Sequence, residues 1–89
     1  MATVGSVARR YPPNERQLVD RLAANVRRLR LARGLTLQAA SERAQMHLRL
    51  WEKVEAGETS ATLQTIARLA AALDVDAREL LDPPAARRG

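Results

Sequence analysis

Arginine and lysine are the residues whose number and placement point to a chemistry in this chain. Residues 1–53 contain eleven Arg or Lys against four Asp or Glu, a net charge of +7, whereas residues 54–89 contain four against six, a net charge of −2. A basic half of this kind favours a polyanionic partner, because clustered cationic side chains attract phosphate groups. A solvated arginine-rich surface has the same composition, so charge alone leaves nucleic-acid binding and plain solvation equally open.

The sequence shows no residue pattern that is typical of a catalytic or metal-binding site. The chain has one histidine and no cysteine, so thiolate ligands and disulfides are excluded, and a single histidine gives no basis for a Ser–His–Asp arrangement. Its glycines, Gly5, Gly34, Gly57 and Gly89, are too far apart to form a phosphate-binding loop. We therefore expect no enzyme activity, no metal site and no cofactor.

Length and composition favour one small helical domain. The chain has 89 residues, room for a single domain, and 46% of them are hydrophobic, which supports a folded core. Its aromatic residues are Tyr11 and Trp51, so the core must consist of Leu, Val, Ile and Ala, which favours helices. No apolar run approaches the roughly 20 residues that span a bilayer, and residues 1–10 lack the apolar stretch of a secretory signal. We expect a cytoplasmic protein without membrane association.

Helical periodicity and capping residues predict five helices, an all-α fold. The first begins at Asn14, which can form a capping box with Gln17, and ends at Gly34. The later helices run from Thr36 to about Ala44, over residues 48–56, from just after Ser60, and over residues 77–81, the last with a capping box of Asp76 and Glu79. Residues 14–82 form the predicted domain, between a flexible arm at 1–13 and a loose tail at 83–89.

The segment between Gly34 and Gly57 gives the strongest local signal. It places two short helices on either side of a tight turn at Gln45-Met46, and the second helix has polar residues along one face. In a helix-turn-helix, the first of two such helices supports the second, whose early side chains contact base edges in the major groove. The pattern therefore predicts a helix-turn-helix, with double-stranded DNA as the partner.

The stretch from Leu22 to Leu81 resembles the Cro/repressor-type helix-turn-helix domain, also called the xenobiotic-response-element type. The matching runs are VRRLRLARGLTLQAASERA, VEAG and TLQTIARLAAALDVDARELL, and they cover about two-thirds of the chain. The resemblance implies a five-helix repressor-like bundle and a sequence-specific transcription regulator, a repressor or controller, that acts as a homodimer. For the dimer contacts we expect Val75, Leu80 and Leu81, with ordinary closure of the core as the alternative role of these side chains.

The resemblance also implies roles for individual residues. It pairs Arg30, near the end of the first helix, with Glu55, near the end of the recognition helix, in a structural ion pair. The other implied positions are Leu48, Arg49, Glu52 and Lys53 at base edges and Gln38 and His47 near phosphate. Arginine and lysine suit guanine, glutamate suits cytosine, and leucine suits the methyl group of thymine.

The chain departs from the family pattern at several positions. The departures are Leu37 in place of a phosphate-binding glutamine, a small Ala40, Ser41 in place of alanine, Gln45 in place of a glycine, Trp51 in place of a smaller aliphatic residue, and Glu58-Thr59-Ser60 in place of a basic loop. Because Ala40 is smaller and Trp51 larger than usual, their volumes can compensate each other. Leu37 and the segment Glu58-Thr59-Ser60 remove usual phosphate contacts, and none of the departures changes the expected fold.

A second hypothesis is a protein-interaction module, or an antitoxin-like partner-binding protein, built on the same fold. Leu37, Leu48 and Leu50 would then form an exposed apolar patch for a protein partner, unless they pack inward against Trp51. A third hypothesis, a sequence-neutral nucleoid protein, rests on charge alone and ranks last.

Overall fold

The fold is a bundle of helices arranged around one long central helix. The computed structural model describes residues 12–83, and this range is helical without any strand. Its elements are α2 (Glu15–Ala32), α3 (Leu37–Arg43), α4 (Leu48–Ala56), α5 (Leu63–Leu73) and α6 (Ala77–Leu81). The all-α prediction and the expected third-helix bounds are confirmed, whereas most of the predicted arm and tail lies outside the described residues.

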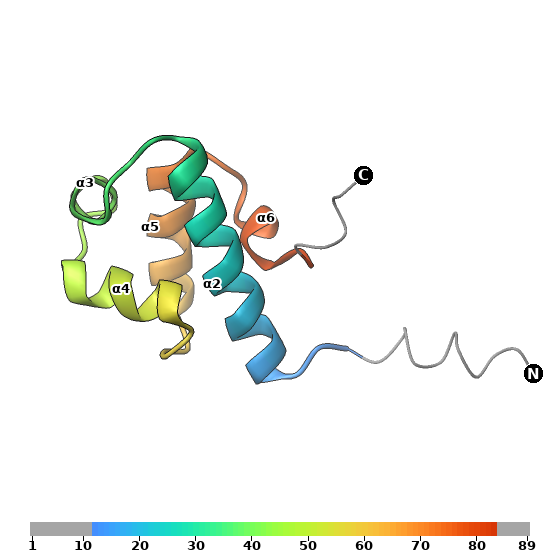
Figure 1. Ribbon diagram of the computed structural model, residues 1–89. Helices are drawn as coiled ribbons and strands as arrows, with labels where there is room; N and C mark the ends of the chain where they lie inside the picture. The colour runs from blue at the N-terminus through green and yellow to red at the C-terminus, as the bar shows by residue number, and fades with distance from the viewer. Residues whose placement is uncertain (1–11, 84–89) are drawn as a thin grey trace, which may run out of the picture.

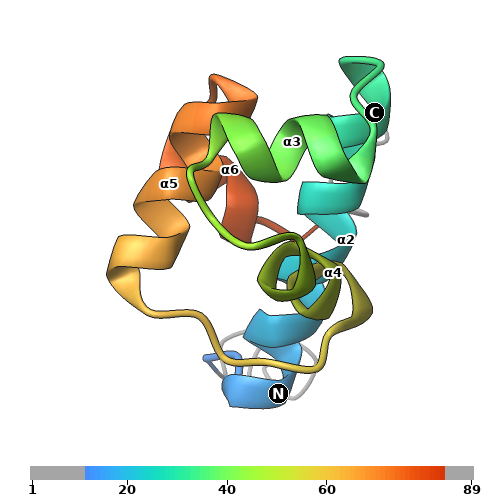
Figure 2. The ribbon, with the colours of Figure 1, turned by 90° about the vertical axis from the view of Figure 1, so that its left-hand side faces the viewer.

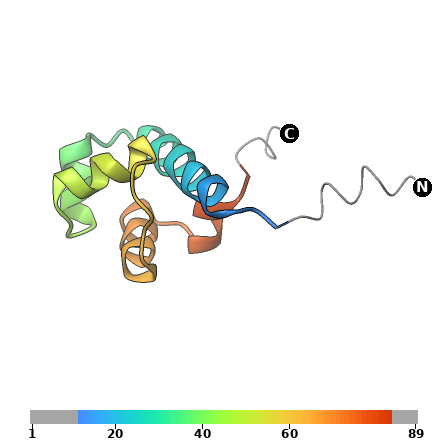
Figure 3. The same cartoon turned by 90° about the horizontal axis from the view of Figure 1, so that it is seen from below.

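Helix α2 packs against α4, α5 and α6. Figures 1 and 3 show α4 and α6 on opposite sides of α2, so α6 packs away from α4. Seen from the side of α4, α3 lies across the top of the molecule, between α5 and α2 (Figure 2). This arrangement leaves one side of α4 against the bundle and the other side open.

Local capping explains where the helices begin. The Asn14 side chain accepts from the Gln17 backbone N–H at 2.8 Å, and the Gln17 side chain accepts from the Asn14 N–H at 2.9 Å, so the first capping box forms as predicted. The start predicted after Ser60 is wrong, because Thr62 is the N-cap of α5 and its hydroxyl accepts from the Thr65 N–H at 3.1 Å. A threonine hydroxyl three residues before a free amide is an N-cap of the same kind as a serine hydroxyl.

The start of α6 also differs from the prediction. The Asp76 carboxylate accepts from the Arg78 backbone N–H at 2.7 Å, and the structure shows no return bond from the Glu79 side chain to the Asp76 backbone. The cap is therefore a single bond, which is sufficient for a helix of five residues that is held mainly by packing.

The core is aliphatic apart from one indole. Trp51 and Ala40 are both completely buried and belong to the same cluster. The large volume of Trp51 can therefore be compensated by the small volume of Ala40, as the sequence predicts. The other large side chains that are almost fully buried are Leu69, Leu73, Leu80, Val26 and Val54. These residues come from α2, α4, α5 and α6, so burial in one cluster holds the helices together.

Asn25 is the buried polar residue that joins α2 to α6. Its side chain is 1% exposed, and its amide nitrogen donates to the carbonyls of Leu80 at 2.9 Å and Asp82 at 2.8 Å. The last carbonyls of a helix have no partner within the helix, so Asn25 satisfies two acceptors that burial would otherwise leave unpaired. The amide oxygen accepts from Arg28 Nη2 at 3.2 Å.

The substitution Asn25→Asp is expected to destabilise the domain by about 2–3 kcal/mol, because a carboxylate cannot donate to two carbonyls and carries a charge into a buried site. Urea unfolding followed by circular dichroism measures the change. The matched control is Asn14→Asp, which makes the same chemical change at an exposed N-cap and should leave stability within about 0.5 kcal/mol. Equal stability of the two variants would contradict this role for Asn25.

Asp74 ends α5 in an unfavourable conformation. It has a φ of 57°, in the left-handed region, and its carboxylate lies at the negative end of the helix dipole. Its carboxylate forms an ion pair with Arg33 at 3.7 Å. Because the carboxylate is exposed and the guanidinium is half-exposed, this ion pair contributes little to stability.

The substitution Asp74→Gly is therefore expected to stabilise the domain by about 1 kcal/mol, since glycine adopts this conformation without the steric cost. For a domain of this size the thermal midpoint should rise by about 4–8 °C, which differential scanning calorimetry measures. Asp74→Asn removes the charge and keeps a side chain, so it should give part of the gain. A lower midpoint for the glycine variant would show that the exposed ion pair matters more than the backbone.

Candidate nucleic-acid interface

The turn between α3 and α4 sets the angle between these two helices. Gln45 lies at its centre with a φ of 55°, at the position where the resemblance led us to expect glycine. The Met46 N–H donates to the Ser41 carbonyl at 3.0 Å, and Arg68 of α5 donates from Nη1 to the Gln45 carbonyl at 3.0 Å. These bonds hold the left-handed turn without glycine, so α3 and α4 keep the close arrangement that a helix-turn-helix requires.

The two sides of α4 differ sharply in burial. Trp51 and Val54, three residues apart, are 0% and 1% exposed and face the core. Arg49, Glu52 and Lys53 are exposed, and within residues 12–83 their side chains make no hydrogen bond or ion pair. A helical period of 3.6 residues separates these two sets onto opposite faces. The outer face of α4 is therefore polar, charged and available to a partner.

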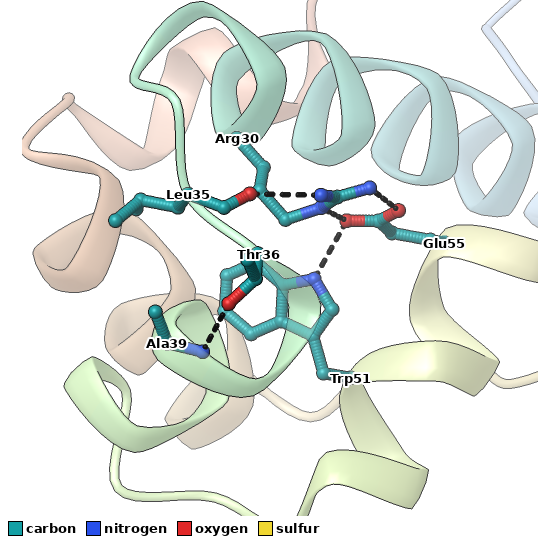
Figure 4. A network of polar contacts seen from close by, with 6 residues as sticks. All are labelled: Arg30, Leu35, Thr36, Ala39, Trp51 and Glu55. Carbon is teal, nitrogen blue, oxygen red and sulfur yellow. Dashed lines mark hydrogen bonds and ion pairs between the residues drawn. The ribbon is translucent and has the colours of Figure 1, made fainter.

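A buried network fixes how α4 sits on α2 (Figure 4). Arg30 donates from Nε to Glu55 Oε2 at 2.6 Å and from Nη2 to Glu55 Oε1 at 3.0 Å, a two-bond pair whose side chains are 9% and 7% exposed. Arg30 Nη1 donates to the Leu35 carbonyl at 2.9 Å, and Trp51 Nε1 donates to Glu55 Oε2 at 2.6 Å. We call Arg30, Glu55 and Trp51 the clamp.

The clamp joins α4 to α2 through the Glu55 carboxylate and reaches the loop before α3 through Arg30. Glu55 receives three donors, so the charge of its carboxylate is fully compensated although the group is almost buried. The hydrogen bonds to Glu55 raise the pKa of Arg30 above its ordinary value, so the guanidinium stays charged. Because Arg30 also holds the Leu35 carbonyl, the loop before α3 is tied to the same point, and α4 cannot roll without breaking several bonds.

The far end of α4 is held separately. Gly57 ends the helix with a φ of 70°, and its carbonyl accepts from Arg16 Nη2 at 2.7 Å. The same Arg16 nitrogen donates to Asp20 at 2.8 Å, which orients the guanidinium along α2. A Cβ at position 57 would lie 3.2 Å from Arg16 Nη2, so glycine suits both the backbone conformation and the close approach.

Several arginines bind the protein's own backbone, which the composition did not reveal. Five of them donate to main-chain carbonyls: Arg16 to Gly57, Arg21 to Leu81, Arg30 to Leu35, Arg43 to Ala72 and Arg68 to Gln45. Each acceptor carbonyl lies at the end of a helix or in a turn, where main-chain carbonyls have no partner within a helix. A good part of the positive charge therefore stabilises the fold, and less of it faces a partner than the net charge suggests.

The structure places the predicted contact residues as follows. Leu48, Arg49, Glu52 and Lys53 all lie on α4, with Leu48 half-buried and the other three exposed. His47 is exposed at the N-cap of α4 and gives no side-chain capping bond. Gln38 is exposed on α3 and donates to Glu42 at 2.7 Å. The four α4 positions are thus brought together on one short helix, flanked by His47.

The exposed leucine patch of the second hypothesis does not form, and the alternative of inward packing applies. Leu37, Leu48 and Leu50 are all half-buried, and Leu37 and Leu50 pack against the core cluster. Among the described residues the large apolar side chains that are mainly exposed are Leu31 and Leu63, on α2 and α5. Leu80, one of the three residues expected in a dimer contact, is 0% exposed and belongs to the core, while Val75 and Leu81 are half-buried.

Residues 12–83 contain no group of three or more His, Asp or Glu side chains placed to hold a metal ion. None of the helices described above is both long and apolar enough to cross a membrane.

Comparison with known proteins agrees with this geometry. The family model of the helix-turn-helix domain matches residues 21–82. A hypothetical transcription factor from Neisseria has a solved structure similar to 88% of this chain and 88% of its own, with a TM-score of 0.77 and 31% identity. The restriction-modification controller protein C.AhdI from Aeromonas hydrophila is also 31% identical, with a TM-score of 0.67 over 70% of this chain and 94% of its own.

No curated protein matches the chain significantly in sequence. The family match covers well over half of the chain, and it spans α3, the turn at Gln45 and α4, the elements that the clamp fixes. The chain therefore belongs to the helix-turn-helix domain family, in its Cro/repressor-type form.

Proposed function

We propose that this protein is a sequence-specific DNA-binding transcription regulator that acts in the cytoplasm as a homodimer. The observation that carries the proposal is the exposed face of α4, where Arg49, Glu52 and Lys53 stand without partners on a helix fixed by the clamp. An α-helix with its side chains is about 10–12 Å across and fits into a major groove about 12 Å wide, and the nine residues of α4 extend about 14 Å along its axis. This geometry supports insertion of α4 into DNA.

The chemistry of the exposed face indicates how bases would be recognised. Arg49 or Lys53 would donate to O6 and N7 of guanine, and Glu52 would accept from N4 of cytosine. Leu48 would contact the methyl group of thymine, while Gln38 and His47 would bind phosphate beside the groove. Because this face combines hydrogen-bond donors, one acceptor and one apolar side chain, we expect a DNA site that contains both G·C and A·T base pairs.

A homodimer would explain how a short helix gains enough specificity. Two copies of α4 would contact half-sites about 34 Å apart, one turn of DNA, and would make the site palindromic. The similarity to a restriction-modification controller protein and to a hypothetical transcription factor supports a role as repressor or controller. Val75 and Leu81, which are half-buried, stay the predicted dimer contacts, and Leu80 no longer belongs to that set.

Selection from random double-stranded DNA tests the proposal. We expect enrichment of a symmetric site whose half-site centres are about 10 base pairs apart, together with a steep loss of affinity as salt rises. Equally weak binding to all fragments at moderate salt would contradict sequence-specific recognition. Enrichment of a single half-site would contradict the homodimer and leave the α4 contacts in place.

The protein-interaction module is the weaker candidate. It needs three leucines at the surface, and two of these, Leu37 and Leu50, pack against the core. Leu48 alone gives too small an apolar surface for a stable protein contact. No other feature of α3 or α4 favours this function.

A further inference from the structure

A small hollow opens beside the exposed face of α4. It has a volume of about 220 Å³ and lies where α2, the start of α3 and the second half of α4 come together. Its lining residues are Arg27, Leu37, Glu52, Glu55 and Ala56. Glu52 belongs both to this hollow and to the predicted base-contacting face, so the hollow directly borders the surface that would enter the groove.

Arg27 is the cation of this hollow. It precedes Arg30 by three residues on α2, so both side chains lie on neighbouring turns of the same helix. Arg30 is engaged in the clamp, where the Glu55 carboxylate already receives three donors and has no need of a fourth. The Arg27 side chain is exposed and, within residues 12–83, makes no hydrogen bond or ion pair.

The other cations around α4 are engaged inside the protein. Arg16 holds Gly57 and Asp20, Arg43 holds Ala72, and Arg68 holds Gln45. No positive charge comes from the remaining neighbours of the groove-facing surface, which are Leu37 at the start of α3 and the segment 58–60 after α4. Among the described residues that lie beside α4, Arg27 is therefore the cation that is not engaged by another group of the protein.

We propose that Arg27 is a DNA-backbone contact, whose guanidinium binds a phosphate group at the edge of the groove that α4 enters. This inference rests on the proposed DNA-binding function and adds a residue that neither the composition nor the resemblance identified. Guanidinium groups match phosphate oxygens with two parallel hydrogen bonds, and Arg27 lines a hollow that lies next to α4. The contact carries no sequence information and fixes the register of α4 on the duplex.

The test compares Arg27→Ala with wild type by fluorescence anisotropy on the selected site and on an unrelated duplex, over a series of salt concentrations. We expect affinity for both duplexes to fall by a similar factor, about 5- to 10-fold at low salt, and the salt slope to decrease by about 0.9. Arg27→Lys keeps the positive charge and should therefore retain most of the salt dependence of binding affinity. The matched control is Arg78→Ala on α6, on the other side of α2, which should change neither quantity.

The possible results separate the inference from the function on which it rests. If wild type binds its site and Arg27→Ala keeps the same affinity and slope, the Arg27 contact is wrong and the proposed function stands. A change of base preference without a change of slope would also overturn it, because Arg27 would then act through Glu52. If wild type binds no duplex, the proposed function itself fails. Thermal unfolding of each variant shows that the exposed substitutions leave the fold intact.

Discussion

Replacement of Glu55 by alanine is expected to destabilise the domain by about 3–5 kcal/mol, a large part of the stability of a domain of this size. The variant leaves the Arg30 guanidinium almost buried without a counter-charge and leaves the Trp51 Nε1–H without an acceptor. A buried charge that loses its partner costs more than the pair contributed, because the desolvation penalty remains. Urea unfolding followed by circular dichroism measures the loss.

Three further variants identify the cause of this loss. Glu58→Ala removes an exposed carboxylate three residues along the chain and should change stability by less than about 0.5 kcal/mol. Arg30→Met combined with Glu55→Leu removes both charges and should be more stable than either single variant. Trp51→Phe removes one donor to the Glu55 carboxylate and part of a fully buried ring, so it should cost about 2–4 kcal/mol. A loss below about 1 kcal/mol for Glu55→Ala would show that the clamp does not hold α4.

The double substitution Arg49→Ala with Lys53→Ala is expected to weaken binding to the selected DNA site by at least about 30-fold. Each side chain that donates to a guanine edge contributes about 1–3 kcal/mol of discrimination, and both side chains are exposed on the open face of α4. Anisotropy titrations on the selected site and on an unrelated duplex measure the loss. The loss should be larger on the selected site, because base contacts are lost there in addition to charge.

The matched control for this prediction is the removal of two other cations, Arg78→Ala with Arg27→Ala. That variant lowers the net charge by the same amount and should weaken binding to both duplexes by a similar, smaller factor. Both double variants should unfold at the wild-type midpoint, since none of the four side chains is buried. If loss of Arg49 and Lys53 weakened both duplexes equally, α4 would contact phosphate rather than bases.

Most of the secondary structure could be predicted from the sequence because the signals that determine it are local. The Asn14–Gln17 capping box, the Thr36 cap and the glycine at position 57 act over three or four residues, and each is found at its predicted place. The start of α5 was misplaced because Ser60 is by itself the better N-cap, whereas the helix begins after Thr62, a choice that the packing of the helix makes. The resemblance, carried by the runs around Gly34 and Gly57, predicted the family, which the family match confirms.

The sequence by itself determined the helix-turn-helix: the helices, their short connections and the order of charged and apolar residues along α4. Only the tertiary structure decided the partners of the polar side chains. Asn25 of α2 bonds to the Leu80 carbonyl of α6, and arginines bond to carbonyls up to 60 positions away; such contacts leave no periodic trace in the chain. The physical reason is that a hydrogen bond needs a particular distance and direction between two groups, and only the folded path of the backbone provides them.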